Sequence, residues 1–254
     1  MLVFLRTFPI LIGLTIALGA MALFWFPAAL FWVIGISLLV LFFLLSRLVD
    51  WKFKKLDTWA LIGIPFLLAV SSFSLLLFVE GQNMKIIIIS LATFLVWLFA
   101  ENLFTYLHLP KAYQVNALEY LAMVVNVLSV YFFTTALFAV RLFLSLPLWL
   151  VVPVFVVLIF VAIATTLWAC KISKERLLPY ALGGTGLATE LFVVFTLLPS
   201  GFFPNATLLT LFFYLFLGIV RAQLLNKLNK AVIKRYFLAV VLITILTIWT
   251  SRWT

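Results

Sequence analysis

Residues 148–169 read LWLVVPVFVVLIFVAIATTLWA, a run that contains no charged side chain. At the rise of an α-helix this run is about 33 Å long, which matches the hydrocarbon thickness of a bilayer, about 30 Å. The rest of the chain has the same character, because 67% of its 254 residues are hydrophobic and 9% are charged. A water-soluble domain of this length covers its surface with polar groups, so the composition predicts an integral membrane protein.

Apolar runs of similar length repeat along the whole chain, and none of them alternates as the strands of a membrane barrel do. The predicted fold is therefore all-α, a polytopic helical membrane bundle that forms one integral membrane domain, residues 1–254. We predict nine transmembrane helices, near residues 8–25, 28–46, 59–79, 86–107, 116–140, 148–169, 180–198, 206–222 and 233–250. Residues that favour turns separate these runs, namely Pro27, Asp57, Gly81–Asn83, Pro110, Pro147, Pro179 and Pro199–Gly201.

The basic residues predict the orientation, because Lys and Arg accumulate at the cytoplasmic ends of membrane spans. If the N-terminus is cytoplasmic, all of the 17 basic residues fall inside except Lys85, Arg141 and Arg252. We therefore expect a cell-membrane protein with its N-terminus inside and its C-terminus outside. A cleaved signal peptide is the competing interpretation of the first run, which however continues through Phe24–Phe26 without a polar break.

The net charge of +10 does not indicate a nucleic-acid partner, since the basic residues stand in short loops beside the apolar runs. Anionic lipid headgroups are the nearer partner for such loops, so we expect contact with the bilayer and these headgroups. Two segments, 47–58 and 221–236, are long enough to lie on the membrane surface. The second has the apolar and basic faces of an amphipathic connector. A partner membrane protein is left open.

An internal repeat is a further hypothesis. Under a shift of 89 residues, four pairs of identical residues superpose with their spacing kept: Glu101 and Glu190, Pro110 and Pro199, Asn116 and Asn205, and Ala117 and Ala206. Each copy would hold three helices, which predicts units 1–86, 87–175 and 176–254 with the middle unit inverted. Evenly spaced apolar spans also match one another at such a period by chance, so common ancestry of the units is left open.

Two acidic residues, Glu101 and Glu190, are the main candidates for function. Each precedes a helix-ending Pro by nine residues, which predicts a depth of about 13 Å below the membrane surface. A bare carboxylate at that depth is costly, so such residues usually face a wet cavity or a partner. With alternating units, both would reach one central site, as in many secondary transporters. A protonated Glu that ties neighbouring helices together is the alternative.

Three further polar residues accompany these glutamates. Asn102 follows Glu101 directly, and Asn126 lies about 15 Å into its predicted helix, so both are expected to line the same space or to bond between helices. Glu119 follows Asn116 by three residues, the spacing of a capping box, and we interpret it as a helix cap.

The single His108 stands at the cytoplasmic end of its predicted helix. No second His and no cluster of Cys or Asp accompanies it, so we predict no metal site. A proton relay and a hydrogen bond to a loop carbonyl are both open for it. Gly183, Gly184 and Gly186 favour close helix packing, with local unwinding as the alternative. They do not form a phosphate loop, because the Lys and Ser/Thr of that motif are missing.

No catalytic motif is found, so an enzyme is disfavoured and no cofactor is expected. Three functions remain. The first is a small secondary transporter or ion-coupled carrier that works through Glu101 and Glu190. The second is a structural or assembly subunit of a membrane complex, and the third is an intramembrane lipid-modifying enzyme that uses the two carboxyls as acid and base.

Overall fold

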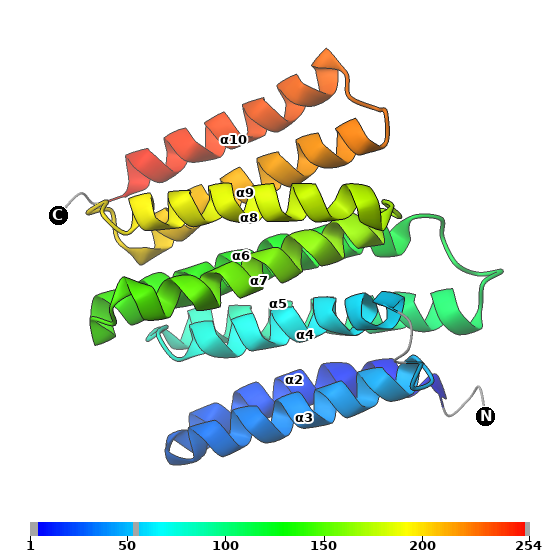
Figure 1. Ribbon diagram of the computed structural model, residues 1–254. Helices are drawn as coiled ribbons and strands as arrows, with labels where there is room; N and C mark the ends of the chain where they lie inside the picture. The colour runs from blue at the N-terminus through cyan, green and yellow to red at the C-terminus, as the bar shows by residue number, and fades with distance from the viewer. Residues whose placement is uncertain (1–4, 53–55, 252–254) are drawn as a thin grey trace. The chain divides into compact units, whose positions relative to one another are not determined.

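The computed structural model describes residues 5–52 and 56–251, and this part of the chain folds into α-helices joined by short turns (Figure 1). Nine of the described helices are long and apolar enough to cross a bilayer, which confirms the predicted multi-pass helical membrane fold. In chain order the elements are α2 (Phe8–Trp25), the 3-10 turn η1 (Pro27–Ala29), α3 (Leu30–Leu48), α4 (Leu56–Leu76), α5 (Gln82–His108), α6 (Ala117–Leu144), α7 (Leu148–Ala169), α8 (Lys174–Phe195), α9 (Phe202–Leu224) and α10 (Lys230–Thr250).

Most of the predicted turn residues do separate helices. Gly81 is the N-cap of α5, and Pro147 is the N-cap of α7. Pro179 does not, because it is the sixth residue of α8, which begins at Lys174 rather than near residue 180. At this position the proline removes one intrahelical hydrogen bond, the one to the carbonyl of Glu175, and the helix continues through it. Asp57 likewise lies in the first turn of α4 rather than before it.

The second basic segment, 221–236, is not a single amphipathic connector, so that prediction is wrong. Helix α9 continues to Leu224, and a turn follows in which Asn226 has a φ of 53°. Asn229 then caps α10, since its side chain accepts a hydrogen bond from the amide of Ala231 at 3.3 Å. In the first segment, 47–58, the described residues end α3 and begin α4, and residues 53–55 lie outside the described range.

The chain divides into two compact units, Met1–Ser129 and Val130–Thr254, which we describe separately as unit 1 and unit 2. In unit 1, α2 packs against α3 and α5, and α4 packs against α3 and α5. Large side chains such as Leu41, Phe73 and Phe99 are fully buried there. The predicted repeats 1–86, 87–175 and 176–254 stay a prediction, because this division does not compare the three copies with one another.

In unit 2, α7 packs against α8, α8 against α9, and α9 against α10. Its core contains a stack of aromatic rings in which Phe192 of α8 lies 4.3 Å from Phe155 of α7 and 4.8 Å from Phe138 of α6, measured between ring centroids. Helix α10 buries none of its residues.

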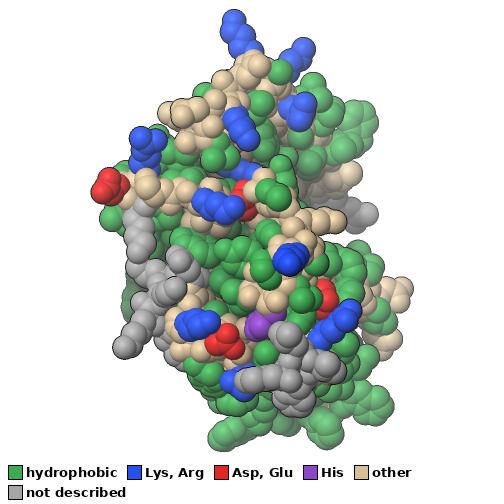
Figure 2. Space-filling view, turned by 90° about the vertical axis from the view of Figure 1, so that its right-hand side faces the viewer, with side chains coloured by type: hydrophobic (Ala, Val, Ile, Leu, Met, Phe, Trp, Pro, Cys, Tyr) green, Lys and Arg blue, Asp and Glu red, His purple; other side chains and the backbone are tan. Residues whose placement is uncertain are grey.

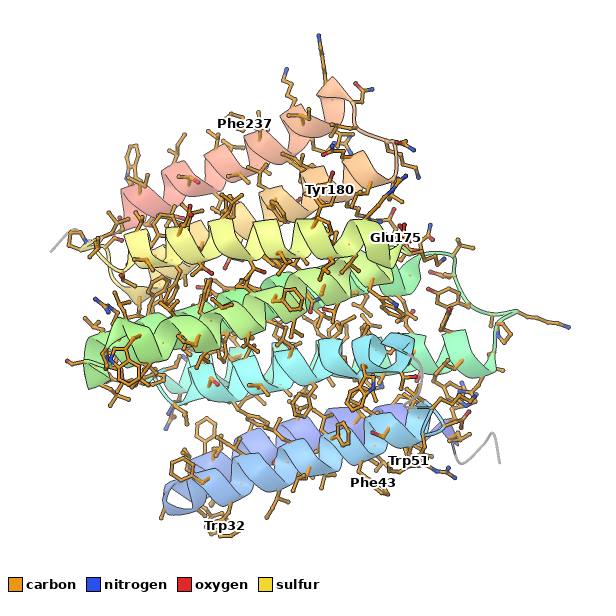
Figure 3. The ribbon with its side chains drawn as sticks, in the orientation of Figure 1. Trp32, Phe43, Trp51, Glu175, Tyr180 and Phe237 are labelled. Atoms are coloured by element: carbon orange, nitrogen blue, oxygen red, sulfur yellow. The ribbon has the colours of Figure 1, made fainter. Side chains whose placement is uncertain are left out.

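The outer surfaces of the helices are apolar, and charged side chains stand mainly at helix ends. Phe31 and Trp249 are each 85% exposed, and Trp32, labelled in Figure 3, is 76% exposed. Figure 2 shows Lys and Arg side chains at helix ends, with hydrophobic side chains beside them. Large exposed aromatic side chains are costly in water and favourable in lipid, so the surface fits a bilayer as its surroundings.

Candidate functional site

Glu190 lies in a groove between α7 and α8, within unit 2. The volume of the groove is about 920 Å³. Its polar lining comes from Thr185, Thr189 and Glu190, all on α8. The walls are otherwise apolar and are formed by Val156, Val157 and Phe160 of α7 and by Leu182, Val193 and Val194 of α8.

The glycines of α8 explain why this helix packs closely on one side and leaves space on another. A Cβ atom added at Gly184 would overlap the ring of Phe216 on α9 and lie 3.0 Å from Cδ1 of Ile163 on α7. A Cβ added at Gly183 or Gly186 would meet nothing within 4 Å, and Gly186 lines the groove. The backbone stays helical from Lys174 to Phe195, so the glycines do not unwind the helix.

Glu190 is an exposed residue that lines this groove, and no basic side chain lines the groove with it. No Lys or Arg lines the groove, and among residues 5–52 and 56–251 the structure shows neither an ion pair nor a hydrogen bond for this side chain. The hydroxyls of Thr185 and Thr189 donate to carbonyl oxygens of their own helix, at 2.7 Å each. Because those hydrogens are already used, a hydrogen bond to the carboxylate would have to come from outside the helix, and in hydrocarbon the carboxylate needs a proton or a cation.

Both glutamates lie closer to the end of their helix than the nine-residue spacing to the next proline predicts. Helix α8 ends at Phe195, five residues after Glu190, so the carboxyl lies about 8 Å from the helix end. Helix α5 ends at His108, seven residues after Glu101, which corresponds to about 10 Å. Each chain segment turns before its proline, and helical rise does not apply to those last residues. Both glutamates nevertheless lie inside segments that are long and apolar enough to span a bilayer.

Glu101 is half-buried on α5, in unit 1. The side-chain amide of Asn102 donates to the carbonyl oxygen of Leu98 at 2.8 Å, so it bonds within its own helix. Glu190 belongs to unit 2, and its groove is formed by α7 and α8 alone among the described helices. The site shared by Glu101 and Glu190 therefore stays a prediction.

The start of α6 differs from the predicted capping box. Asn116 has a φ of 67°, whereas an N-cap residue usually has an extended backbone. The amide of Leu118 donates to the hydroxyl of Tyr113 at 3.1 Å, so a tyrosine five residues upstream satisfies one amide of this helix start. Glu119 is buried in the first turn of α6, and Asn126 is fully buried further along the same helix.

His108 is the last residue of α5, as its place beside Pro110 predicts. Its ring stacks on Phe104 with the centroids 5.0 Å apart and the planes 19° apart. Within the described residues no group of three His, Cys, Asp or Glu side chains is placed to hold a metal ion. The structure therefore places His108 in an aromatic contact at the end of α5, in unit 1.

The apolar walls of the groove are the part of the site that sequence analysis missed. Val156, Val157 and Phe160 have the same residue types as every other span, so nothing in the sequence distinguishes them. No protein family model matches the chain, and comparison with curated proteins and with solved structures found no match either.

Proposed function

We propose that this multi-pass membrane protein is a small secondary carrier that binds a cation at the Glu190 carboxylate, in the groove between α7 and α8. The observation that carries the proposal is an exposed glutamate in a helix that is long and apolar enough to span a membrane, with no basic residue lining its groove. Hydrocarbon supplies no counter-charge, so the carboxylate binds either a proton or a cation. A single carboxylate that binds both in turn couples the movement of one to the movement of the other.

The lining of the groove supports a substrate class. Its walls are apolar, so they favour an organic cation whose charge is carried on an apolar body. The volume of about 920 Å³ lies within the range of about 300–1,000 Å³ that small-molecule sites have. A bare metal ion would need several more oxygen ligands than this groove offers.

Glu101 is the second carboxyl of the proposal, as a group that carries a proton during the transport cycle. It shares with Glu190 a position within the last third of a spanning helix and a spacing of nine residues before a proline. Because the groove is formed by α7 and α8, we assign binding of the cation to Glu190 and only proton movement to Glu101.

The test uses the purified full chain in proteoliposomes with an acidic lumen, and measures uptake of radiolabelled tetraphenylphosphonium. Empty liposomes define passive entry of this lipophilic cation. Wild-type protein should raise the initial rate of uptake above passive entry. Glu190→Gln should return the rate to the passive level, because an amide of the same shape carries no charge.

The matched control is Glu175→Gln, which changes an exposed Glu in the first turn of the same helix, outside the groove (Figure 3). This variant should transport as the wild type does. Glu101→Gln should still bind tetraphenylphosphonium in an equilibrium titration while its uptake falls. Transport by a folded Glu190→Gln protein at the wild-type rate would refute the proposal.

A subunit of a membrane complex is the second candidate, and one observation favours it. Gly183, Gly186 and Glu190 follow one another at spacings of three and four residues, and all three are exposed. Such a stripe fits a partner helix that carries a basic residue. Co-purification of a membrane partner that Glu190→Gln abolishes, without any transport activity, would support this function. No observation favours a lipid-modifying enzyme, since the described groove lining contains one carboxyl and no second acid or base.

A further inference from the structure

A second pocket in unit 2 lies where α6 and α8 end and α9 begins. Its volume is about 380 Å³, and Arg141, Thr196, Gly201 and Asn205 are among the residues that line it. It shares none of these residues with the Glu190 groove. Gly201, with a φ of 83°, forms the turn that leads into α9 at the edge of this pocket.

Arg141 and Asn205 supply the free side-chain donors of this pocket, because the hydroxyl of Thr196 donates to the carbonyl oxygen of Val193 at 2.6 Å. No carboxylate lines the pocket, and among the described residues Arg141 has neither an ion pair nor a hydrogen bond. The buried side chain of Asn205 accepts from Oγ of Ser200 at 2.5 Å and donates to the carbonyl of Leu198 at 3.4 Å. Since a side-chain amide has two hydrogens, one more is left to donate.

Backbone amides add to this set of donors. The first residues of α9 have no intrahelical acceptor for their amides, and Phe202, the first residue, lines the pocket. Pro204 follows two residues later and has no amide hydrogen. The guanidinium group, the spare amide hydrogen of Asn205 and the helix start therefore all favour an anion in the same pocket.

The distribution of charge in unit 2 makes Arg141 exceptional. The end of the unit at which α7 and α9 finish carries eight basic residues in the sequence: Lys171, Lys174, Arg176, Arg221, Lys227, Lys230, Lys234 and Arg235. Among the described residues at the opposite end, Arg141 is the only basic one. Basic residues that set topology gather at one side, so a cation at the other side calls for a different role.

We propose that this pocket binds a phosphate group, with the Arg141 guanidinium as its principal ligand. Arg141 lies three residues before the end of α6, the level at which a spanning helix meets the lipid headgroups. The planar fork of Arg matches two phosphate oxygens, which a single Lys ammonium does not. The phosphate group comes either from a phospholipid headgroup or from free phosphate.

The experiment measures binding to the purified full chain in a phosphate-free nonionic detergent by native mass spectrometry. One arm uses dioctanoyl phosphatidylglycerol, a second uses inorganic phosphate, and dioctanoylglycerol serves as the lipid without phosphate. At least one phosphate arm should show saturable binding to wild type, and the arm that binds identifies the source. Arg141→Gln should weaken that binding about tenfold, the effect expected when hydrogen bonds to a charged group are removed.

Two further variants keep the test decisive. Arg141→Lys keeps the charge and should retain binding at a level between wild type and Arg141→Gln. Lys85→Gln removes another cation predicted on the outer side, one that lies over the ring of Phe24 at 5.2 Å in unit 1, and should leave binding unchanged. The proposal is overturned if neither phosphate arm binds, if Arg141→Gln binds as tightly as wild type, or if dioctanoylglycerol binds equally well. None of these results depends on whether Glu190 transports a cation.

Discussion

Single residues decide where α8 packs and where it leaves space. Gly184 allows the ring of Phe216 to approach the backbone, whereas the neighbouring Gly183 faces open space. Two adjacent glycines of one helix thus have different roles, although their sequence context is nearly the same.

This difference predicts opposite effects of the same substitution. Gly184→Ala should destabilise the protein, because the new methyl group overlaps Phe216 and approaches Ile163, and overpacking costs about 1–3 kcal/mol. Gly183→Ala adds a methyl group in open space and should stabilise the helix by up to about 1 kcal/mol. Unfolding midpoints in detergent, followed by circular dichroism, measure both. Equal shifts in the two variants would contradict this view of the glycine run.

Some residues of the site can be predicted from the sequence, and others cannot. Glu190 is conspicuous because a charged residue in an apolar run is rare, so the sequence alone singles it out. The Tyr113 hydroxyl that caps α6 and the donors around Arg141 depend on turns whose geometry has no simple sequence signal. In the sequence, Arg141 is distinguished only as an exception to the gathering of Lys and Arg residues at one side of the membrane.

At the scale of elements, the apolar runs predict the spans well because hydrocarbon thickness dictates their length. The predicted and observed helix bounds differ mainly at helix ends that carry polar residues. Helix α8 begins six residues before the predicted position and continues through Pro179. The helix ends that carry Lys and Arg, such as the last turn of α9, extend beyond the apolar window that predicts them.

Helix α10 buries none of its residues and packs mainly against α9, so its packing can be tested at that one helix pair. Its Tyr236 ring covers Gly218 of α9 and lies 5.2 Å from the ring of Tyr214. Gly218→Val should displace Tyr236 and weaken the packing of α10 by about 1–3 kcal/mol. Gly35→Val is the control, because a Cβ at Gly35 meets nothing within 4 Å.

The measurement for α10 is the rate of cleavage after Lys227 or Lys230 by a lysine-specific protease. Both residues are exposed: Lys227 lies in the turn between α9 and α10, and Lys230 is the first residue of α10. Cleavage should be several-fold faster in Gly218→Val than in Gly35→Val, because a loosened α10 exposes the turn more often. Indistinguishable rates would show that the Tyr236 contact does not hold α10.

For the molecule as a whole, the apolar helices and the composition indicate a membrane-embedded chain. The distribution of charge predicts its orientation. An odd number of crossings puts the two termini on opposite sides, and the basic residues predict a cytoplasmic N-terminus. This orientation and the three-unit repeat stay predictions, because the spans are identified by length and composition only and the chain divides into two units.

Our proposal for Glu190 requires that its side chain lies inside the hydrocarbon, in a groove open to lipid. It is tested most directly by a nitroxide spin label at position 190 of the reconstituted full chain, with Cys170 replaced by Ala and a label at position 175 for comparison. The label at 190 should collide with oxygen, which dissolves in hydrocarbon, and be shielded from a water-soluble nickel chelate, while the label at 175 should show the reverse. If the label at 190 collides with the nickel chelate as readily as the label at 175, Glu190 faces water, and the account of a carboxylate in the membrane is wrong.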